Sequence, residues 1–353
     1  MRGSEFIATL PPGPGPQREQ MILDAVLAGD WYASWVPITV QSENMSADFL
    51  VSSDKLMSGE PGDYVRVNCT QPTAQLIADH LNCVLPTSQL CDQIYAHADL
   101  KLEPILRSNW MGDNPKTAKV EGDGSASTSR RMLDYSRLVD EAIGGRDYGL
   151  VANVSKDWIN TDKFGVDPNR VPRKYGQPVE CNYGWYKGAR TLSSDYLTTI
   201  PGMYVWQGPG TAHDWNHTDY SQMVRLVARA VHICQPVGIS GFGGEEAEGQ
   251  PCTLPNGGQG AYHVVDIYEM PHVPEWSRLL SRDTRPYIMR HPLVPWAGGV
   301  AIPFDPAWRP HGPARPSAPA PVSPAAVGTA GKVAALLAGG IVGYSAVNWL
   351  RRR

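Results

Sequence analysis

The stretch HDWNHTDYSQMVRLV, residues 213–227, gathers side chains that carry acid–base, nucleophilic and metal chemistry. His213 is a candidate base with Asp219 as its orienting partner, and Ser221 is a candidate nucleophile. His213 and His217 are also candidate ligands of a divalent metal. The same polar groups could instead cap one another in a loop that enters a buried strand, and the spacing leaves both interpretations open.

Three charged residues in other segments could stabilise charge that develops during a reaction. Lys156 and Asp157 stand in VSKDW, where they could equally form an ion pair at a strand end, and Arg225 stands in the late apolar run. Aromatic residues near these segments suit either a groove that stacks on sugar rings or an ordinary core. The candidate substrate-binding residues are Trp185, Tyr186, Trp215 and Tyr220.

The elements around these residues predict an α+β fold with a mixed or antiparallel sheet core and N-terminal helices. Pro86 should separate two helices because it lacks an N–H, and Thr87 is a good N-cap for the second. Helical periodicity occurs at 17–30, on both sides of Pro86 within 73–98, and at 130–145. Strand character, judged from β-branched and aromatic content, occurs at 35–41, 48–56, 63–69, 148–159, 181–186, 202–208, 220–234 and 262–270.

Composition divides the chain into four parts. Residues 1–20 are interpreted as a flexible Pro/Gly leader, whose opening MRGSEF matches a vector-derived start, and residues 21–302 as a globular body. Residues 303–330 are a Pro/Ala-rich linker that should be extended. Residues 331–353 are predicted to form a C-terminal apolar helix with an arginine-rich end.

Within that helix the uncharged run 333–350 is just long enough to span a bilayer, and it could equally be buried in a protein assembly. Gly339 and Gly343 stand at GxxxG spacing, which would let two such helices approach closely and self-associate. The N-terminus has no visible secretory signal. We therefore expect a membrane-associated, cell-surface or virion location without a defined export route.

The charge balance argues against nucleic acid as a partner, since 31 basic and 35 acidic side chains give a net charge of -4. The 6 cysteines lie at wide spacings without a CxxC pair. That pattern disfavours a structural zinc site and predicts mostly free, buried thiols. The one cofactor that the residues suggest is a divalent metal at His213 and His217.

Several segments in order resemble a family of uncharacterised, usually exported bacterial and phage proteins. They are CVLPT and DYSQMVRLV, together with AVLAGDWYASWVPITV, YGLVANVSKDWI and NYGWY. The resemblance covers residues 22–230 and implies no established activity. In that family histidines commonly stand where this chain has Val154, Tyr186 and Gln222, which implies that this chain has lost part of any site those histidines form.

Two functions stay open at this point. The first is a cell-envelope hydrolase, active or degenerate, that acts on peptidoglycan, another polysaccharide or an ester. The second is a non-enzymatic virion, surface or assembly protein, displayed on the linker from an oligomerising C-terminal helix. The polar segment 213–227 favours the first function, whereas the linker and the apolar tail favour the second.

Overall fold

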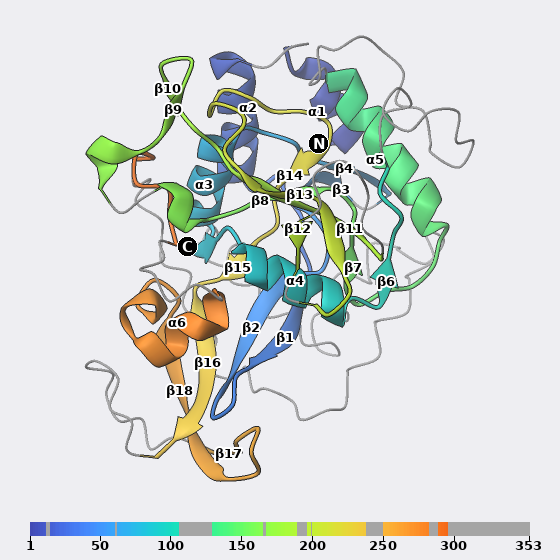
Figure 1. Cartoon of the computed structure of the whole chain (residues 1–353). Helices are drawn as coiled ribbons and strands as arrows, with labels where there is room; N and C mark the ends of the chain where they lie inside the picture. The colour runs from blue at the N-terminus through green and yellow to red at the C-terminus, as the bar shows by residue number, and fades with distance from the viewer. Residues whose placement is uncertain are drawn as a thin grey trace, which may run out of the picture.

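The fold is mixed α+β, as the order of the elements predicted (Figure 1). The computed structural model describes residues 1–11, 15–60, 62–105, 129–164, 167–188, 196–198, 200–237, 250–281 and 289–295. The predicted linker (303–330) and C-terminal apolar helix (331–353), with Gly339 and Gly343, lie outside these residues. Within the described ranges, no helix is long and apolar enough to cross a membrane.

The helices confirm the predicted break at Pro86. Thr87 caps the helix that follows it, since its Oγ1 accepts a hydrogen bond from the Leu90 N–H at 3.1 Å. The described α-helices are α1 (Gly3–Thr9), α2 (Pro16–Leu27), α3 (Gln71–His80), α4 (Ser88–His97), α5 (Ser129–Ile143) and α6 (Pro274–Leu280). Short 3-10 turns are η2 (Asp162–Phe164), η3 (Pro168–Arg170) and η4 (Met270–His272).

The N-terminal segment differs from the flexible leader expected for residues 1–20. Helix α1 packs against the strands β3 (Met57–Glu60) and β4 (Asp63–Arg66), and Phe6 and Ile7 are buried in the core. Ser4 donates a hydrogen bond from its hydroxyl to Asp63. Apolar side chains that the body buries therefore hold this segment in place, in spite of the prolines and glycines that follow it.

A seven-stranded antiparallel sheet forms one layer of the molecule. Its order is β17 (Pro251–Thr253), β18 (Gln259–Asp266), β16 (Ala230–Pro236), β2 (Ser46–Ser52), β15 (Val227–Ala228) and β5 (Cys83–Val84), with β1 (Trp35–Gln41) also paired to β2. Phe49 and Val51 of β2 are fully buried in a core that α4 and α6 share. The paired strands β16 and β18 extend from this sheet to the lower end of the view in Figure 1.

A smaller five-stranded sheet carries most of the candidate site. Its order is β12 (Tyr196–Leu197), β13 (Tyr204–Gly210), β11 (Asn182–Lys187), β8 (Lys156–Trp158) and β14 (Gln222–Met223). All its pairs are antiparallel except β14 with β8, which is parallel. Three two-stranded pieces complete the described strands: β3 with β4, β6 (Leu100–Lys101) with β7 (Val151–Ala152), and β9 (Arg173–Lys174) with β10 (Gln177–Pro178).

The cysteines agree with the prediction of mostly free thiols and add one bridge that spacing could not indicate. Cys234 and Cys252 form a disulfide between β16 and β17. The free, buried cysteines are Cys69, Cys83, Cys91 and Cys181. Burial raises the pKa of the Cys69 and Cys91 thiols well above the ordinary value, so both side chains behave as small apolar groups.

Candidate functional site

Lys156 is the centre of a polar cluster on one face of the five-stranded sheet. In the strand register Gln222 of β14 stands opposite Lys156 of β8. In the pairing of β11 with β13, Gln207 stands opposite Gly184. The Lys156 Nζ donates a hydrogen bond to Gln207 Oε1 at 2.8 Å, and the lysine is only 2% exposed. Burial lowers the pKa of Lys156, whereas the nearby carboxyl groups of Asp219 and Glu180 oppose that shift.

An irregular backbone brings Trp185 to the same face. Gly184 has φ 140° and Trp185 has φ 61°, and the register of β11 shifts at this point. A Cβ on Gly184 would lie 3.3 Å from the Lys156 Cα, so the close approach of the two strands favours glycine. As a result the Lys156 ammonium lies 5.1 Å from the centre of the Trp185 ring, a cation–π distance.

The segment that contains Asp219 and Ser221 is a tightly hydrogen-bonded turn. Asp219 Oδ1 accepts from the Ser221 N–H at 2.7 Å and from its hydroxyl at 2.5 Å, and the Asp219 N–H donates to Gln222 Oε1 at 2.9 Å. Burial would raise the pKa of Asp219. The charge of Lys156, together with contacts from His217 and Ser221, has a larger effect than burial and holds the pKa of Asp219 well below its usual range. Asp219 is therefore an ionised carboxylate at neutral pH.

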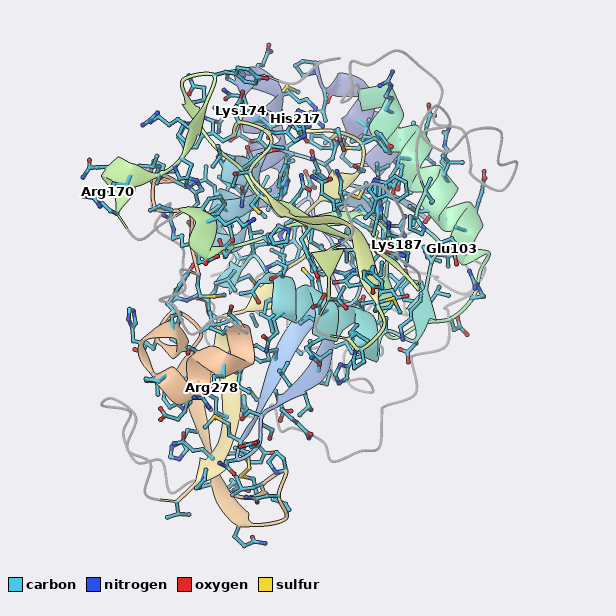
Figure 2. All side chains as sticks on the ribbon, viewed as in Figure 1. Glu103, Arg170, Lys174, Lys187, His217 and Arg278 are labelled. Carbon is cyan, nitrogen blue, oxygen red and sulfur yellow. A yellow bond between two sulfur atoms is a disulfide. The ribbon has the colours of Figure 1, made fainter. Side chains whose placement is uncertain are left out.

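His213 and His217 lie on the outer side of the cluster and stack on each other, with ring centroids 3.9 Å apart and planes within 8° (Figure 2 labels His217). Burial, followed by His217 and Lys156, lowers the pKa of His213 to about 4, so its imidazole is neutral at pH 7. His217 Nε2 lies 3.9 Å from Asp219 Oδ2, which is too far for a hydrogen bond.

This stacking does not suit the predicted metal site. A metal bonds in the plane of an imidazole, and two nearly parallel, stacked planes offer no common point for an ion. In the part of the chain that the structure describes, no three His, Cys, Asp or Glu side chains are grouped to hold a metal. Metal binding by His213 and His217 stays a prediction that would need at least one ring to turn.

Glu180 is the residue that the sequence analysis missed. It is 1% exposed, and neither of its carboxyl oxygens has a hydrogen-bond partner among the described residues. Its N–H donates to the His213 carbonyl at 3.2 Å, which ties it to the loop above the sheet. Burial, reinforced by Asp219, raises the pKa of Glu180 well above its usual range despite Lys156. Burial thus favours the protonated form of Glu180, whereas the nearby Asp219 is held ionised.

The structure does not bring Asp157 and Arg225, two of the predicted site residues, into this cluster but pairs them elsewhere. Asp157 Oδ1 accepts a hydrogen bond from Lys55 Nζ and lies 3.9 Å from Arg225 Nε. Arg225 also donates to the Ser52 carbonyl at 2.7 Å and to the Val151 carbonyl at 2.9 Å. Neighbouring strand residues point to opposite faces, so Asp157 turns away from Lys156 into a buried ion network.

The four aromatic candidates also lie at different places relative to the Lys156 cluster. Trp185 lies at the cluster, whereas Tyr186 points to the opposite face, where its hydroxyl donates to Asp92 of α4 at 3.0 Å. Tyr220 is buried against Tyr135, with ring centroids 5.2 Å apart. Trp215 is partly exposed in the loop, and its backbone N–H donates to the Pro178 carbonyl at 2.8 Å. Trp185 thus reaches the cluster from the core and is 1% exposed, whereas Trp215 is the one of the four candidates that is partly exposed.

The positions that carry histidine in the resembling family do not meet at one place. Val154 packs in the apolar cluster that contains Trp185 and Tyr220, and Tyr186 packs in a different cluster. Gln222 alone stands opposite Lys156.

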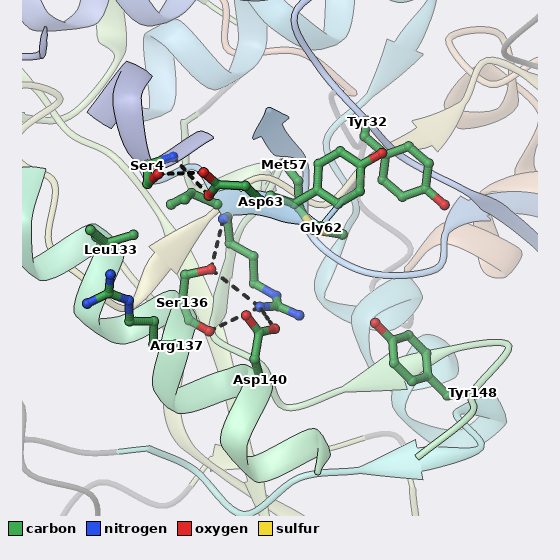
Figure 3. A pocket seen from close by; sticks show the side chains of 13 residues that line it. Ser4, Tyr32, Met57, Gly62, Asp63, Leu133, Ser136, Arg137, Asp140 and Tyr148 are labelled. Carbon is green, nitrogen blue, oxygen red and sulfur yellow. Dashed lines mark hydrogen bonds and ion pairs between the residues drawn. The ribbon is translucent and has the colours of Figure 1, made fainter. Parts of the chain in front are cut away.

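A separate pocket of about 650 Å³ lies between α5 and the β3–β4 hairpin (Figure 3). The stacked rings of Tyr32 and Tyr64, 4.7 Å apart, form part of its wall. Arg66 also lines it, but its guanidinium is engaged by Asp54 at 2.7 Å and by Asp140 at 2.7 Å. None of the residues lining this pocket belongs to the Lys156 cluster.

The cluster of Lys156, Glu180, Asp219 and Trp185 thus combines an ionised carboxylate, a neutral carboxylic acid, a buried ammonium and an indole. Such a set can donate a proton to one atom of a bound molecule and accept a proton, or stabilise positive charge, at another. Comparison of the chain with protein-family models, with curated proteins and with solved structures found no match.

Proposed function

We propose that this protein is a hydrolase that cleaves glycosidic bonds in a cell-envelope polysaccharide such as peptidoglycan. The single observation that carries the proposal is a pair of buried carboxyl groups near Lys156 in opposite surroundings: Glu180 has no hydrogen-bond partner among the described residues, whereas Asp219 accepts twice from Ser221. Their pKa values are accordingly shifted in opposite directions. Two titratable groups that their surroundings push apart in this way are typical of an acid and base assignment.

In the proposed reaction Glu180 is the general acid. It gives its proton to the glycosidic oxygen as the bond between that oxygen and the anomeric carbon breaks. Asp219, held ionised by Lys156, stabilises the positive charge that develops on the sugar. The Glu180 carboxylate formed in the first step then takes a proton from the attacking water, which restores the acid. The products are two shorter sugars: the leaving sugar keeps the glycosidic oxygen and the Glu180 proton as its new hydroxyl, and water supplies the hydroxyl on the anomeric carbon of the other.

The geometry supports an ester hydrolase with Ser221 as nucleophile less well. The Ser221 hydroxyl donates to Asp219 at 2.5 Å, within the same turn, and a carboxylate this acidic is a weak base for a serine. The neutral His213 lies on the outer side, where it suits contact with substrate better than activation of Ser221. We therefore assign the chemistry to Glu180 and Asp219 and keep His213 and Trp215 for binding.

The disulfide between Cys234 and Cys252 supports a location in the envelope or on a surface, because such bridges form and persist in oxidising compartments. Attachment through residues 333–350, and self-association through Gly339 and Gly343, are part of this proposal and lie outside the described residues. The resemblance to exported bacterial and phage proteins points the same way.

The test measures reducing ends released from purified peptidoglycan and from chromogenic glycosides. Glu180→Gln and Asp219→Asn should each lower the rate by about 10²- to 10⁴-fold, the usual contribution of a positioned acid or base. Asp134→Asn, which removes an exposed carboxylate on α5, is the matched control and should leave the rate unchanged. Unaltered hydrolysis in Glu180→Gln, or no hydrolysis of any glycan by the wild type, would overturn the proposal.

A non-enzymatic surface or virion protein is the second candidate, and the burial of the cluster favours it. Glu180, Lys156 and Ser221 are all nearly inaccessible to solvent, so a substrate must displace part of the loop that carries His213 and His217. Removing residues 331–353 should abolish assembly of such a protein and leave its body folded. Analytical ultracentrifugation of the truncated and full chains measures this, and the glycan assay separates the two functions: assembly by the full chain without hydrolysis of any glycan supports the second candidate.

A further inference from the structure

Two buried amide groups beside Lys156 each have an atom without a hydrogen-bond partner among the described residues. They are the Oδ1 acceptor of Asn182 and the Nε2 donor of Gln222. Asn182 is 1% exposed and Gln222 is 0% exposed. A buried polar atom left unpaired is costly and uncommon in folded proteins, so each of these atoms needs an explanation.

The strand register places both amides around the proposed catalytic pair. Asn182 is on β11 and Gln222 on β14, the two strands that flank β8. Gln222 stands opposite Lys156, and Asn182 stands opposite Trp158, two residues further along the same strand and hence on the same face. Glu180 comes just before β11, and its carboxyl group lies close enough to Lys156 and Asp219 for their charges to act on it.

The roles of the atoms at Gln222 follow from its other contact. Its Oε1 accepts from the Asp219 N–H at 2.9 Å, so the Nε2 is left as a donor. The site therefore offers one buried acceptor, one buried donor and the neutral acid of Glu180. A ligand amide has the matching pair, an N–H that donates and a C=O that accepts.

We infer that this site recognises the N-acetyl group of an amino sugar. The acetamido N–H would donate to Asn182 Oδ1, and its carbonyl would accept from Gln222 Nε2. The inference rests on the proposed function for its choice of a sugar over a peptide, which also carries amides. A glycosidic bond needs one neutral acid and one carboxylate near each other, which Glu180 and Asp219 supply, and the Trp185 indole adds an aromatic surface that suits a sugar ring.

The test compares binding, so that it does not depend on turnover. Tryptophan fluorescence or calorimetry of the full chain would be measured with an N-acetylglucosamine oligosaccharide and with its de-N-acetylated counterpart of the same length. The acetylated ligand should bind at least about tenfold more tightly, since the counterpart has no carbonyl to accept from Gln222 Nε2 and its ammonium group would face that of Lys156. Equal affinity for the two ligands overturns the inference without relying on any variant.

Variants then locate the effect. Asn182→Leu and Gln222→Met should each reduce the preference for the acetylated ligand to less than about threefold, while Gln177→Met, at an exposed site on β10, should keep it. Tighter binding of an acetylated dipeptide than of the acetylated sugar also overturns the inference. A clear acetamido preference without hydrolysis counts against the proposed function alone, whereas hydrolysis without that preference counts against the inference alone.

Discussion

Replacing Asp157 by alanine should destabilise the protein strongly, because it leaves two buried cations without their shared carboxylate. Lys55 and Arg225 are each 1% exposed, and both lie within ion-pair distance of Asp157 Oδ1. Breaking a buried ion pair by removing one partner usually costs about 3–5 kcal/mol. The carbonyls of Ser52 and Val151 still accept from Arg225, so we expect the lower end, about 3 kcal/mol.

The dependence of this loss on pH identifies its cause. Burial already lowers the pKa of Lys55, and without Asp157 it should fall further. A lysine whose pKa is lower in the folded state than in the unfolded state makes the protein more stable as pH rises toward the ordinary lysine value of about 10.4. The cost of Asp157→Ala should therefore shrink between about pH 7 and pH 9.5, which is a linkage effect of Lys55 alone.

Urea unfolding followed by circular dichroism measures both quantities. Glu60→Ala is the control, because its pair with Arg2 is on the surface, and it should change the free energy of unfolding by less than about 0.5 kcal/mol. A loss below about 1 kcal/mol for Asp157→Ala, or a loss independent of pH, would refute this reasoning. A variant that stays fully stable and loses hydrolysis would return Asp157 to the catalytic residues.

Three further outcomes are expected. Glu180→Gln should raise the melting temperature, and the gain should increase as pH rises above the ordinary glutamate pKa of about 4.3. The reason is that the raised pKa of Glu180 makes its ionised form unfavourable in the folded state, and a gain independent of pH would contradict this. Gly184→Ala should cost about 1–3 kcal/mol in thermal unfolding, since its φ of 140° and the 3.3 Å contact with Lys156 both oppose a side chain, and a neutral result would show that the strands can separate there. Thiol titration in denaturant without reductant should find 4 thiols, and 6 would mean that Cys234 and Cys252 are not bridged.

The parts of the fold that the sequence predicted are those set by local chemistry. Pro86 and Thr87 define the end of one helix and the start of the next without help from distant residues. The buried helix α1 was not predicted, since its neighbours in sequence are prolines and glycines and its partners β3 and β4 lie more than fifty residues away. Long-range packing of Phe6 and Ile7 overrides the local composition there.

The site followed the same division. His213, His217, Asp219 and Ser221 were found because they are close in sequence, and Lys156 joins them through a parallel pairing of β8 with β14 that spacing does not indicate. The alternation of a strand could have separated Asp157 from Lys156. Glu180 was missed because it lies outside the polar segment 213–227, just before the predicted strand 181–186. The positive φ of Trp185, after which Tyr186 points to the opposite face, has no signature in the sequence.

The most direct test of the central claim is a carboxyl-carbon NMR titration of the full chain labelled at glutamate and aspartate, with Glu180→Gln and Asp219→Asn used to assign the two signals. The account predicts that Glu180 keeps its proton well above the ordinary glutamate pKa of about 4.3, whereas Asp219 stays ionised well below the ordinary aspartate value of about 3.9. Ordinary titration of both groups would contradict the assignment of an acid and a carboxylate, and with it the proposed hydrolase.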